Sequence, residues 1–431
     1  MNFKVELDKE LDDLLDLKIH FNTSDHITWN FNKAKNLLEF ESSIGKFADV
    51  LRFEWKRRCF NHTEKIYKSP STPQELNTLN GSKVNFKYER AINYRDWEDK
   101  YFQDIDNFMG FSMFFSSGMG AMINVFHLVR IMFKGTLRGL LIGDYYETTM
   151  LIKNLSIKDM EVNHLNNKSE INNDENYDFI ILEPVRYNTF LHAINEDMIV
   201  NYINDSKSLK TIIIDYTLLS SSFDKESFMK RLNKNIFIFF VKSTLKLDQS
   251  GLEFANSSQV SVYANPNLEE YLVKLRDLFE GQRNVFGSSL SFYEVCQLDY
   301  SKFNKDTDYV GAVLNNARNF SKNLIDSTSD IEVIHPSVLS HTNHSPFLFV
   351  RPKEGRLFNE FKQYLRSYLS KFNVNIPCRN SFGFRNISME AVQMNGSYNV
   401  LKVAPGKING VKQQVLLDGI IYSTRHIGSK V

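Results

Sequence analysis

A serine and a lysine stand three residues apart just after a short apolar segment. Ser243 and Lys246 follow the run 236–241, which is typical of a buried strand. A lysine beyond the end of such a strand lies where α/β proteins hold their ligands. Beside a dry core its amine loses a proton readily and can form an imine with a carbonyl compound. Taken alone, the pattern is more often a surface loop with two ordinary lysines, Lys242 and Lys246.

A carboxylate at the end of an earlier apolar segment favours the chemical interpretation. Asp215 closes the run 210–214 and precedes Lys246 in the chain. An unpaired carboxylate at this place would be costly, so it either caps a helix or pairs with a functional charge. Pyridoxal phosphate requires such a pairing, because an acidic residue that keeps its pyridine nitrogen protonated makes the ring an electron sink.

The third feature is a turn of small residues. Ser117, Gly118 and Met119 lead into the apolar stretch 118–133, which predicts a buried helix. The backbone N–H groups and the dipole of the first helical turn would favour a phosphate at this point. The alternative is a turn that merely lets the helix pack closely. The turn is neither a Walker loop, which needs Gly-Lys-Ser/Thr, nor a GxGxxG motif.

Together these segments resemble the fold-type I pyridoxal-phosphate enzymes, most closely the cysteine and methionine branch with its cystathionine synthases and lyases. Residues 117–121 (Ser-Gly-Met-Gly-Ala) are similar to the branch's Ser-Gly-Met-Ala-Ala phosphate turn, and residues 243–246 (Ser-Thr-Leu-Lys) to its Ser-x-Thr-Lys. The resemblance implies pyridoxal 5'-phosphate as cofactor, with Lys246 forming the Schiff base and Asp215 on the ring nitrogen. The phosphate site that it implies consists of Ser117, Gly118, Met119 and Ser243.

Two further motifs match this branch. Tyr88-Glu-Arg90 is similar to its Tyr-x-Arg, which reaches the phosphate site of the neighbouring subunit, so the resemblance implies a homodimer or homotetramer. Residues 143–149 resemble its Gly-Asp-x-x-Tyr-Gly-Gly-Thr, whose tyrosine stacks on the cofactor ring. The match is one residue short, so Tyr145 or Tyr146 could take that role, and we favour Tyr146, which would also assist catalysis.

The residues expected on the substrate side depart most from the branch. Glu183 lies in a Leu-Glu-Pro segment similar to its Glu-x-Pro, and Asn188 is displaced by one from the expected Asn. Lys402 stands where the branch has an arginine for the substrate carboxylate, and lysine lacks the two-pronged guanidinium fork. We expect Arg385 or Arg379 to assist Lys402, and we favour Arg385. The alternative for Arg385 is an ordinary surface ion pair.

The resemblance implies an enzyme that acts on an amino acid by elimination or replacement at the β or γ carbon, as a lyase or transferase of amino-acid metabolism. The departures from the branch favour a specialised relative. An aminotransferase, or another fold-type I reaction, is the alternative enzyme. A non-catalytic descendant that only binds a ligand or partner is the second alternative. No metal is expected, because His341 and His344 share a helix-like spacing but have no carboxylate nearby.

Apolar runs that alternate with helix-length segments indicate how these residues are positioned. The predicted strands of a first sheet are 137–142, 179–182, 210–214, 236–241 and 260–263. Runs buried on both sides and separated by helices favour a mainly parallel sheet covered by helices, an α/β fold. The predicted elements of a smaller C-terminal α+β domain are strands at 330–334, 347–350 and 400–403 and helices at 358–372 and 413–422.

Three parts of the chain are therefore expected. Residues 1–110 form an N-terminal extension and an arm that contributes to the site of the dimer partner. Residues 111–280 form the large cofactor-binding domain. Residues 281–431 contain an interdomain helix and the small C-terminal domain.

Composition excludes other classes of protein. The chain has 431 residues with 52 Lys+Arg and 51 Asp+Glu, so it presents no general field for nucleic acid. It has no long uncharged apolar run, which argues against a membrane protein. The only partner expected besides a second copy of the chain is a small amino-acid substrate. Three widely spaced cysteines, Cys59, Cys296 and Cys378, and an acidic N-terminus favour the cytoplasm.

Overall fold

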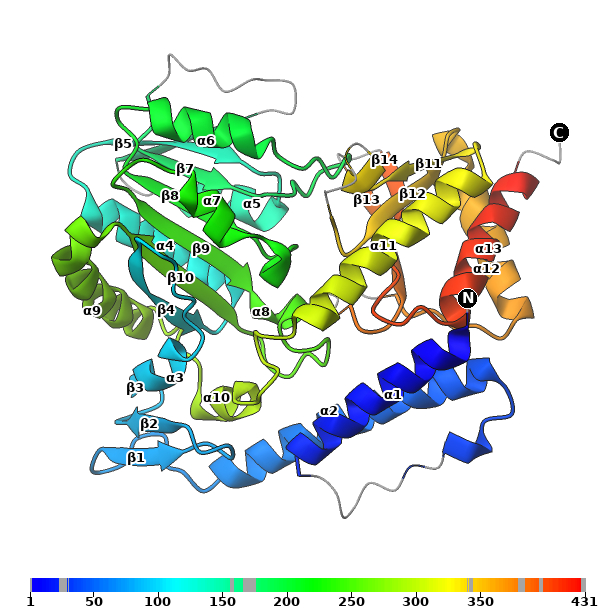
Figure 1. Cartoon of the computed structure of the whole chain (residues 1–431), viewed down its shortest axis with the longest axis horizontal. Helices are drawn as coiled ribbons and strands as arrows, with labels where there is room; N and C mark the ends of the chain where they lie inside the picture. The colour runs from blue at the N-terminus through cyan, green and yellow to red at the C-terminus, as the bar shows by residue number, and fades with distance from the viewer. Residues whose placement is uncertain are drawn as a thin grey trace.

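The computed structural model describes residues 2–22, 29, 31–155, 159–165, 176–338, 340, 344–378, 384–394 and 398–427. Figure 1 shows three groups of elements: a large sheet between helices, a smaller C-terminal sheet with its own helices, and two long N-terminal helices along the lower edge of the view. The large sheet is called the central sheet below, and the C-terminal one the small sheet.

The central sheet has seven strands among the described residues, in the order β4-β10-β9-β8-β7-β5-β6. These strands are β4 Met109–Phe115, β5 Leu137–Ile142, β6 Met160–His164, β7 Phe179–Leu182, β8 Thr211–Asp215, β9 Phe237–Ser243 and β10 Ser258–Ala264. The strands from β9 to β6 pair in parallel, whereas β10 is antiparallel to both β9 and β4. The predicted, mainly parallel sheet is confirmed, and β4 and β6 extend it beyond the strands expected from the sequence.

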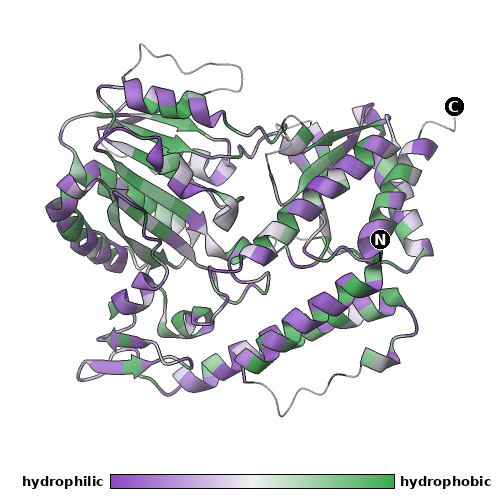
Figure 2. Cartoon of the chain, in the orientation of Figure 1, coloured by the Kyte–Doolittle hydropathy of each residue, from purple (hydrophilic) through white to green (hydrophobic). Residues whose placement is uncertain are grey.

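Helices cover both faces of the central sheet, so its inner strands are apolar along their whole length instead of alternating. The covering helices are α4 Gly118–Met132 and α9 Glu269–Val285 on one face, and α6 Glu196–Asp205 and α7 Lys225–Lys230 on the other. Neighbouring residues of one strand point to opposite faces of the sheet. Phe239 packs in the core on the side of α4 and α9, and Phe240 in the core on the side of α6 and α7. In Figure 2 the strands of this sheet are accordingly mostly green.

Two helices begin where parallel strands end, and both carry residues of interest. Helix α5 (Tyr146–Leu155) follows β5, and the short α8 (Thr244–Leu247) follows β9 directly. The other short elements are α3 Arg95–Asp99, α10 Phe292–Leu298, and single 3-10 turns at Phe31–Lys33, Ser220–Ser222, Pro266–Leu268, Pro336–Val338 and Gly355–Leu357.

The C-terminal part contains the small sheet, which is antiparallel with the order β11-β12-β14-β13. Its strands are β11 Ile331–Ile334, β12 Leu348–Pro352, β13 Ser388–Met394 and β14 Tyr398–Ala404, and its helices are α11 Thr307–Ser327, α12 Phe358–Lys371 and α13 Val411–His426. The predicted smaller α+β domain is confirmed. Strand β13 was not expected, because its residues alternate between partly buried and exposed and carry no apolar run.

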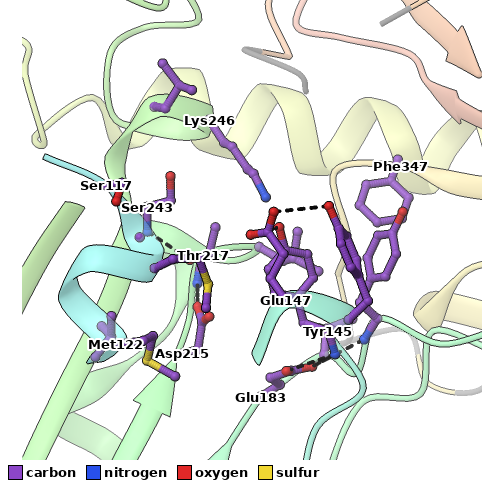
Figure 3. A pocket seen from close by; sticks show the side chains of 18 of the residues that line it. Ser117, Met122, Tyr145, Glu147, Glu183, Asp215, Thr217, Ser243, Lys246 and Phe347 are labelled. Atoms are coloured by element: carbon purple, nitrogen blue, oxygen red, sulfur yellow. Dashed lines mark hydrogen bonds between the residues drawn. The ribbon is translucent and has the colours of Figure 1, made fainter. Parts of the chain in front are cut away.

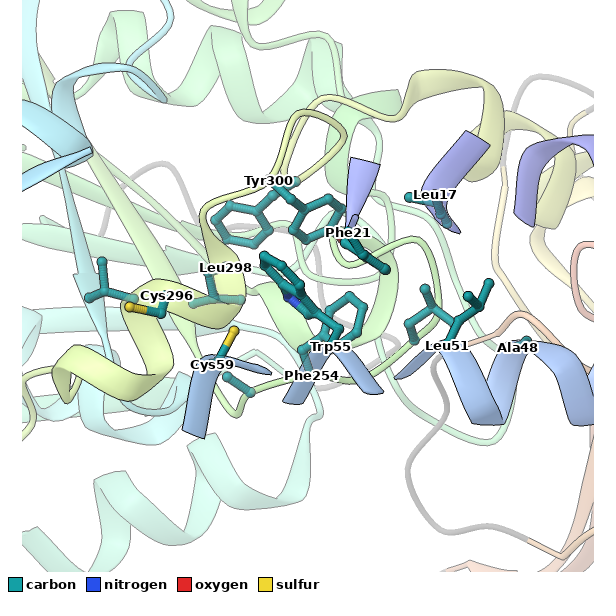
Figure 4. Close-up of a cluster of buried hydrophobic side chains, with 14 of the residues drawn as sticks. Leu17, Phe21, Ala48, Leu51, Trp55, Cys59, Phe254, Cys296, Leu298 and Tyr300 are labelled. Carbon is teal, nitrogen blue, oxygen red and sulfur yellow. The ribbon is translucent and has the colours of Figure 1, made fainter. Parts of the chain in front are cut away.

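The N-terminal part packs tightly against the rest of the chain. It comprises helices α1 Phe3–His20 and α2 Leu37–Thr63 and a small sheet of β1 Gln74–Asn77, β2 Lys83–Phe86 and β3 Ile92–Asn93. Phe21 stacks on Trp55 with ring centroids 4.6 Å apart, and Phe254 and Tyr300 join the same cluster (Figure 4). The indole nitrogen of Trp55 donates to the carbonyl of Gln297 at 2.9 Å. The expected boundaries at 110 and 280 stay predictions.

Two absences concern the described residues only. None of their helices is long and apolar enough to cross a membrane. No group of three or more His, Cys, Asp or Glu side chains in these ranges could hold a metal ion. His341, whose helix-like spacing with His344 was noted without a metal being expected, lies outside the described residues.

Candidate active site

A cavity of about 440 Å³ lies where the carboxyl ends of β8 and β9 meet the start of α4 and the small sheet (Figure 3). Its lining comprises Ser117, Gly118, Met119, Met122, Tyr145, Tyr146, Glu147, Glu183, Val185, Tyr187, Asp215, Thr217, Leu218, Val241, Ser243, Leu245, Lys246, Asn256, Phe347, Phe384 and Lys402. Residues from six separate segments that the sequence singled out therefore share one cavity.

Helix α4 points its N-terminus at this cavity. Ser117 caps the helix, with its Oγ accepting from the backbone N–H of Gly120 at 3.0 Å. Gly118 lies against Ser243, because a Cβ on this glycine would be 3.5 Å from the serine Cβ. The predicted phosphate turn and Ser243 thus form one corner, with backbone N–H groups and the positive end of a 15-residue helix directed into it.

The two lysines of β9 and α8 have different surroundings. Lys246 extends toward Tyr145 and Glu147, with its Nζ 5.5 Å from the centroid of the Tyr145 ring (Figure 3). Burial lowers the pKa of Lys246, although the Asp215 and Glu147 carboxylates oppose the shift. Lys242 does not line this cavity and forms a buried ion pair with Asp248. Lys246 therefore presents to the cavity an amine that loses its proton more readily than an exposed lysine does.

Asp215 ends β8 and reaches the same cavity. Its Oδ1 accepts from the backbone N–H of Thr217 at 3.0 Å, and the Thr217 hydroxyl in turn accepts from the backbone N–H of Ser243 at 2.9 Å. Burial raises the pKa of Asp215, whereas the Thr217 hydrogen bonds and the Lys246 charge oppose this. Thr217 was not among the expected site residues, yet it ties the carboxylate to the phosphate corner.

The two adjacent tyrosines are oriented differently. The Tyr145 ring lies beside Lys246, and its hydroxyl donates to Glu147 Oε2 at 2.8 Å. Tyr146 is 58% exposed at the rim, with its hydroxyl 3.1 Å from Glu147 Oε1. Tyr146 is the first residue of α5, so its side chain leaves the loop in another direction. The structure brings Tyr145, rather than the favoured Tyr146, against the lysine.

Glu147 is a carboxylate that the motif comparison passed over. It lines the cavity, and its charge helps to raise the pKa of Lys246 against the effect of burial. The sequence did contain an indication of this residue, because Glu147 stands where the resembled Gly-Asp-x-x-Tyr-Gly-Gly-Thr motif has a glycine. The carboxylate gives the Tyr145 hydroxyl a proton acceptor inside the site.

Glu183 fixes the loop that carries these tyrosines. Its carboxylate accepts from the backbone N–H groups of Asp144 at 2.9 Å and Tyr145 at 3.1 Å. Gly143 must be a glycine here, since a Cβ would lie 2.5 Å from Glu183 Cδ. Burial, aided by the charge of Asp215, raises the pKa of Glu183 to about 7. Asn188 does not line the cavity and donates to Asp144 Oδ2 at 2.9 Å.

The small sheet contributes a second lysine. Lys402 on β14 is 5% exposed, donates from Nζ to the Tyr187 hydroxyl at 3.3 Å and lies 4.6 Å from the centroid of the Phe347 ring. Burial, with a contribution from the charge of Lys246, lowers its pKa to about 7. Lys402 is thus the cation that this part of the chain presents to the cavity.

The arginines that were expected to assist Lys402 in binding the substrate carboxylate are not seen in the cavity lining. Arg385 does not line the cavity; its guanidinium forms an ion pair with Glu10 at 2.6 Å and donates to the carbonyl of Ser250 at 2.6 Å. Its neighbour Phe384 is the residue of this segment that reaches the lining. Arg379 falls outside the described residues.

The residues expected to reach a partner subunit also lie outside the lining. Tyr88 is 38% exposed, and the guanidinium of Arg90 lies 5.7 Å from the centroid of its ring. Both side chains are therefore at the surface of the single chain.

Comparison with known proteins gives the fold a context. No protein-family model and no curated protein sequence matches the chain. Among solved structures it is similar to cystathione gamma lyase (CalE6) from Micromonospora echinospora, at 13% identity and a TM-score of 0.59 over 79% of this chain and 89% of that one. It is also similar to cystathionine gamma synthase from Xanthomonas oryzae pv. oryzae, solved with aminoacrylate and cysteine, at 13% identity and a TM-score of 0.54 over 73% and 82%.

A third similar structure comes from Campylobacter jejuni subsp. jejuni. This protein, described as an O-acetylhomoserine (thiol)-lyase, carries a pyridoxyl-lysine phosphate; the identity is 15% and the TM-score 0.55, over 79% of this chain and 88% of that one. All three align over most of both chains, so the likeness includes both sheets rather than the central sheet alone. The chain therefore has the fold of the fold-type I pyridoxal-phosphate enzymes of the cysteine and methionine branch, as its motifs predicted.

Proposed function

We propose that the chain binds pyridoxal 5'-phosphate through Lys246 and acts on an amino acid by elimination or replacement at its β or γ carbon. The observation that carries the proposal is the convergence of Lys246, Asp215 and the N-terminus of α4 on one cavity. A site that only bound a ligand would have no need of a buried carboxylate opposite an amine of lowered pKa.

The residues present fit this cofactor. Ser117 and Ser243, with the N–H groups at the start of α4, form a corner suited to a phosphate. Asp215 would hold the ring nitrogen, Tyr145 would pack against the ring, and Lys246 would bind it covalently. When bound, the cofactor supplies an electron sink for bonds at the substrate Cα.

The chain's own residues then supply proton transfer and orientation. Lys246 Nζ, held in a dry setting, can accept the Cα proton and return it, because burial favours the neutral amine. The Tyr145 hydroxyl, paired with Glu147, can donate a proton to a leaving group. Lys402, beside Tyr187 and Phe347, can hold the substrate carboxylate as a point charge.

Borohydride reduction followed by peptide mapping tests the covalent attachment. The purified protein incubated with pyridoxal phosphate should acquire a reduced pyridoxyl group on the peptide with Lys246, and the Lys246→Ala variant should acquire none. The variant Lys242→Ala is the matched control and should still be labelled at Lys246. Label on Lys242, or no label on any lysine, would contradict the proposal.

A panel of amino acids tests the reaction class. Elimination releases ammonia and a keto acid without any acceptor, whereas an aminotransferase needs an added keto acid. Turnover only with a keto acid would therefore select the alternative enzyme. The third outcome is that amino acids change the absorbance of the attached cofactor but none of them is turned over. That outcome would favour the non-catalytic descendant.

We further propose a homodimer in which Arg90 of each chain contacts the cofactor phosphate of the other. An arginine suits a phosphate dianion because its planar fork makes two charge-assisted hydrogen bonds, and the exposed position of Arg90 leaves it accessible to a second chain. A mixture of Arg90→Ala and Lys246→Ala chains should recover activity that neither variant has alone. A monomer at working concentration, or no recovery in the mixture, would reject the composite site.

A further inference from the structure

A second cavity, of about 720 Å³, lies behind the same two strand ends. It is lined by Lys100, Tyr101, Phe102, Gln103, Tyr216, Ser220, Ser221, Ser222, Phe223, Asp224, Lys225, Lys242, Gln259, Asn304, Lys305 and Thr307. Successive residues separate the two cavities: Asp215 and Ser243 line the first, whereas Tyr216 and Lys242 line the second. Side chains alternate between the faces of a strand, so the second cavity has its own chemistry.

The charge of this lining is unbalanced. It contains four lysines, Lys100, Lys225, Lys242 and Lys305, and a single carboxylate, that of Asp224. Asp224 is exposed and accepts from the backbone N–H of Ser227 as the cap of α7. Its carboxylate keeps its charge, but one carboxylate against four ammonium groups leaves the wall with an excess of positive charge.

Lys225 is the buried cation of this wall. The residue is 9% exposed, and its Nζ lies 4.6 Å from the centroid of the Tyr216 ring and 5.3 Å from that of Phe240. The contacts that the structure shows for its ammonium, within the described residues, are with these two aromatic rings rather than with a carboxylate. Aromatic faces compensate only part of the cost of burying an ammonium group, so an anion in the cavity would stabilise it further.

The buried carboxylate whose charge acts on Lys225 is shared with a second lysine. Asp248 Oδ1 is in contact with the ammonium of Lys242 and accepts from the hydroxyl of Ser220 at 2.6 Å. Lys242 shares the Tyr216 ring with Lys225, at 5.4 Å from its centroid. Burial, reinforced by the charge of Lys242, lowers the pKa of Lys225 to about 7. The two ammonium groups therefore share one internal counter-charge.

The entrance of the cavity adds two exposed cations. Lys305 Nζ lies 5.5 Å from the centroid of the Tyr101 ring, and Lys100 donates to the Ser82 hydroxyl at 2.6 Å. The hydroxyls of Ser221 and Ser222 stand in the same lining and are exposed. A ligand with two separated negative groups would meet Lys225 at the back and lysines with hydroxyl donors at the front.

We propose that this cavity is a binding site for a small polyanion, a phosphorylated or polycarboxylated molecule, with Lys225 as its buried anchor. The site is separate from the one that Lys246 lines, and it does not depend on the function proposed above. Its ligand chemistry follows from the excess of ammonium groups and the shortage of carboxylates in one cavity.

Calorimetric titration at constant ionic strength tests the proposal, with pyrophosphate and citrate as the two probes. The full chain is used without free pyridoxal phosphate, because that phosphorylated anion would itself compete for the cavity, and the Ser243→Ala variant identifies any binding at the corner beside Ser117 instead. At least one probe should bind saturably with one site per chain, and the stronger probe distinguishes a phosphorylated from a carboxylated ligand. The absence of saturable binding by both probes would overturn the proposal.

Matched variants locate the bound anion. Lys225→Met should weaken binding at least tenfold, whereas Lys225→Arg should retain it. Lys230→Met is the control, because Lys230 lies on the same helix but is exposed and paired with Glu226; its affinity should stay within twofold. Ser243→Ala should leave binding unchanged. Equal binding by the folded Lys225→Met variant, or loss of binding in Ser243→Ala, would place the anion elsewhere and reject the site.

Discussion

The carboxylate of Glu10 lies 2.6 Å from the guanidinium of Arg385, and both side chains are only 3% exposed. Lys407 adds a second contact to the same carboxylate at 2.7 Å. Arg385 directly follows Phe384, which lines the candidate active site with φ at 53°. The first helix of the chain thus holds the C-terminal segment that closes one wall of the cavity.

Removal of this carboxylate should cost much of the stability of the fold. Glu10→Ala would leave Arg385 buried without its partner, and breaking a buried pair in this way costs about 3–5 kcal/mol. Denaturant unfolding of the variant and the parent measures the difference. The control is Glu6→Ala on the same helix, where the exposed contact with Lys9 predicts a change within about 0.5 kcal/mol. A loss below about 1 kcal/mol for Glu10→Ala would contradict a structural role for the pair.

The two tyrosines of the shortened motif should differ in their effect on catalysis. Tyr145→Phe removes the hydroxyl that is paired with Glu147 beside Lys246, whereas Tyr146→Phe removes one at the exposed rim. General acid catalysis contributes typically 100-fold or more, so kcat should fall by about that factor for Tyr145→Phe and by less than about threefold for Tyr146→Phe. Steady-state kinetics on the same substrate decide between them. The reverse order would restore Tyr146 to the role that the sequence favoured.

Lys402 should impose a pH limit on substrate capture. Its folded-state pKa of about 7 means that the ammonium is lost as the pH rises through 7, and with it the charge that holds a carboxylate. The kcat/KM of the parent should therefore fall above pH 7, while Lys402→Arg, which stays charged, should lack this decline. Lys402→Met should lower kcat/KM roughly 30-fold or more at every pH below 7. Identical pH profiles for the parent and Lys402→Arg would exclude Lys402 as the anchor.

Lys225 should destabilise the fold in a way that depends on pH. Its pKa is lowered from 10.5 to about 7. The buried ammonium therefore destabilises the folded state fully below pH 7, and this destabilisation disappears above pH 10.5, where the lysine is neutral in both states. Lys225→Met should therefore raise the free energy of unfolding, and the gain should shrink by ~3 kcal/mol between pH 7 and 9.5. Denaturant unfolding in a buffer without multivalent anions measures this trend. A gain that does not vary with pH would show that Lys225 stays charged in the fold.

The parts of the structure that the sequence predicted are those decided by local pattern. The strands β5, β7, β8 and β9 are uninterrupted apolar runs, and each was predicted to within two residues at either end. Asp215 and Lys246 could be placed because Asp215 ends one such strand and Lys246 lies just beyond another, and parallel strands bring their carboxyl ends to one edge of the sheet.

The parts that were missed depend on register or on distant contacts. Whether Tyr145 or Tyr146 faces Lys246 depends on the residue at which α5 begins, and helix ends are poorly determined by sequence pattern. Arg385 was expected at the substrate because its actual partner, Glu10, is distant in the sequence and no local pattern indicates their contact. The packing of α1 and α2 was missed for the same reason, since it is decided by residues far along the chain.

Helix α1 is anchored to two different parts of the chain, once near its middle and once just beyond its C-terminal end. Glu10 contacts Arg385 and Lys407 beside the small sheet, whereas Phe21, just beyond its last turn, packs with Trp55 and Phe254 next to the central sheet. The unbroken helix between these two anchors therefore connects the region of the small sheet to that of the central sheet. A movement of the small sheet relative to the central sheet would have to disturb the buried ion pair of Glu10 or the aromatic cluster around Phe21. Through Glu10 and Arg385, helix α1 thus couples the position of Phe384 in the cavity wall to the packing of the N-terminal helices.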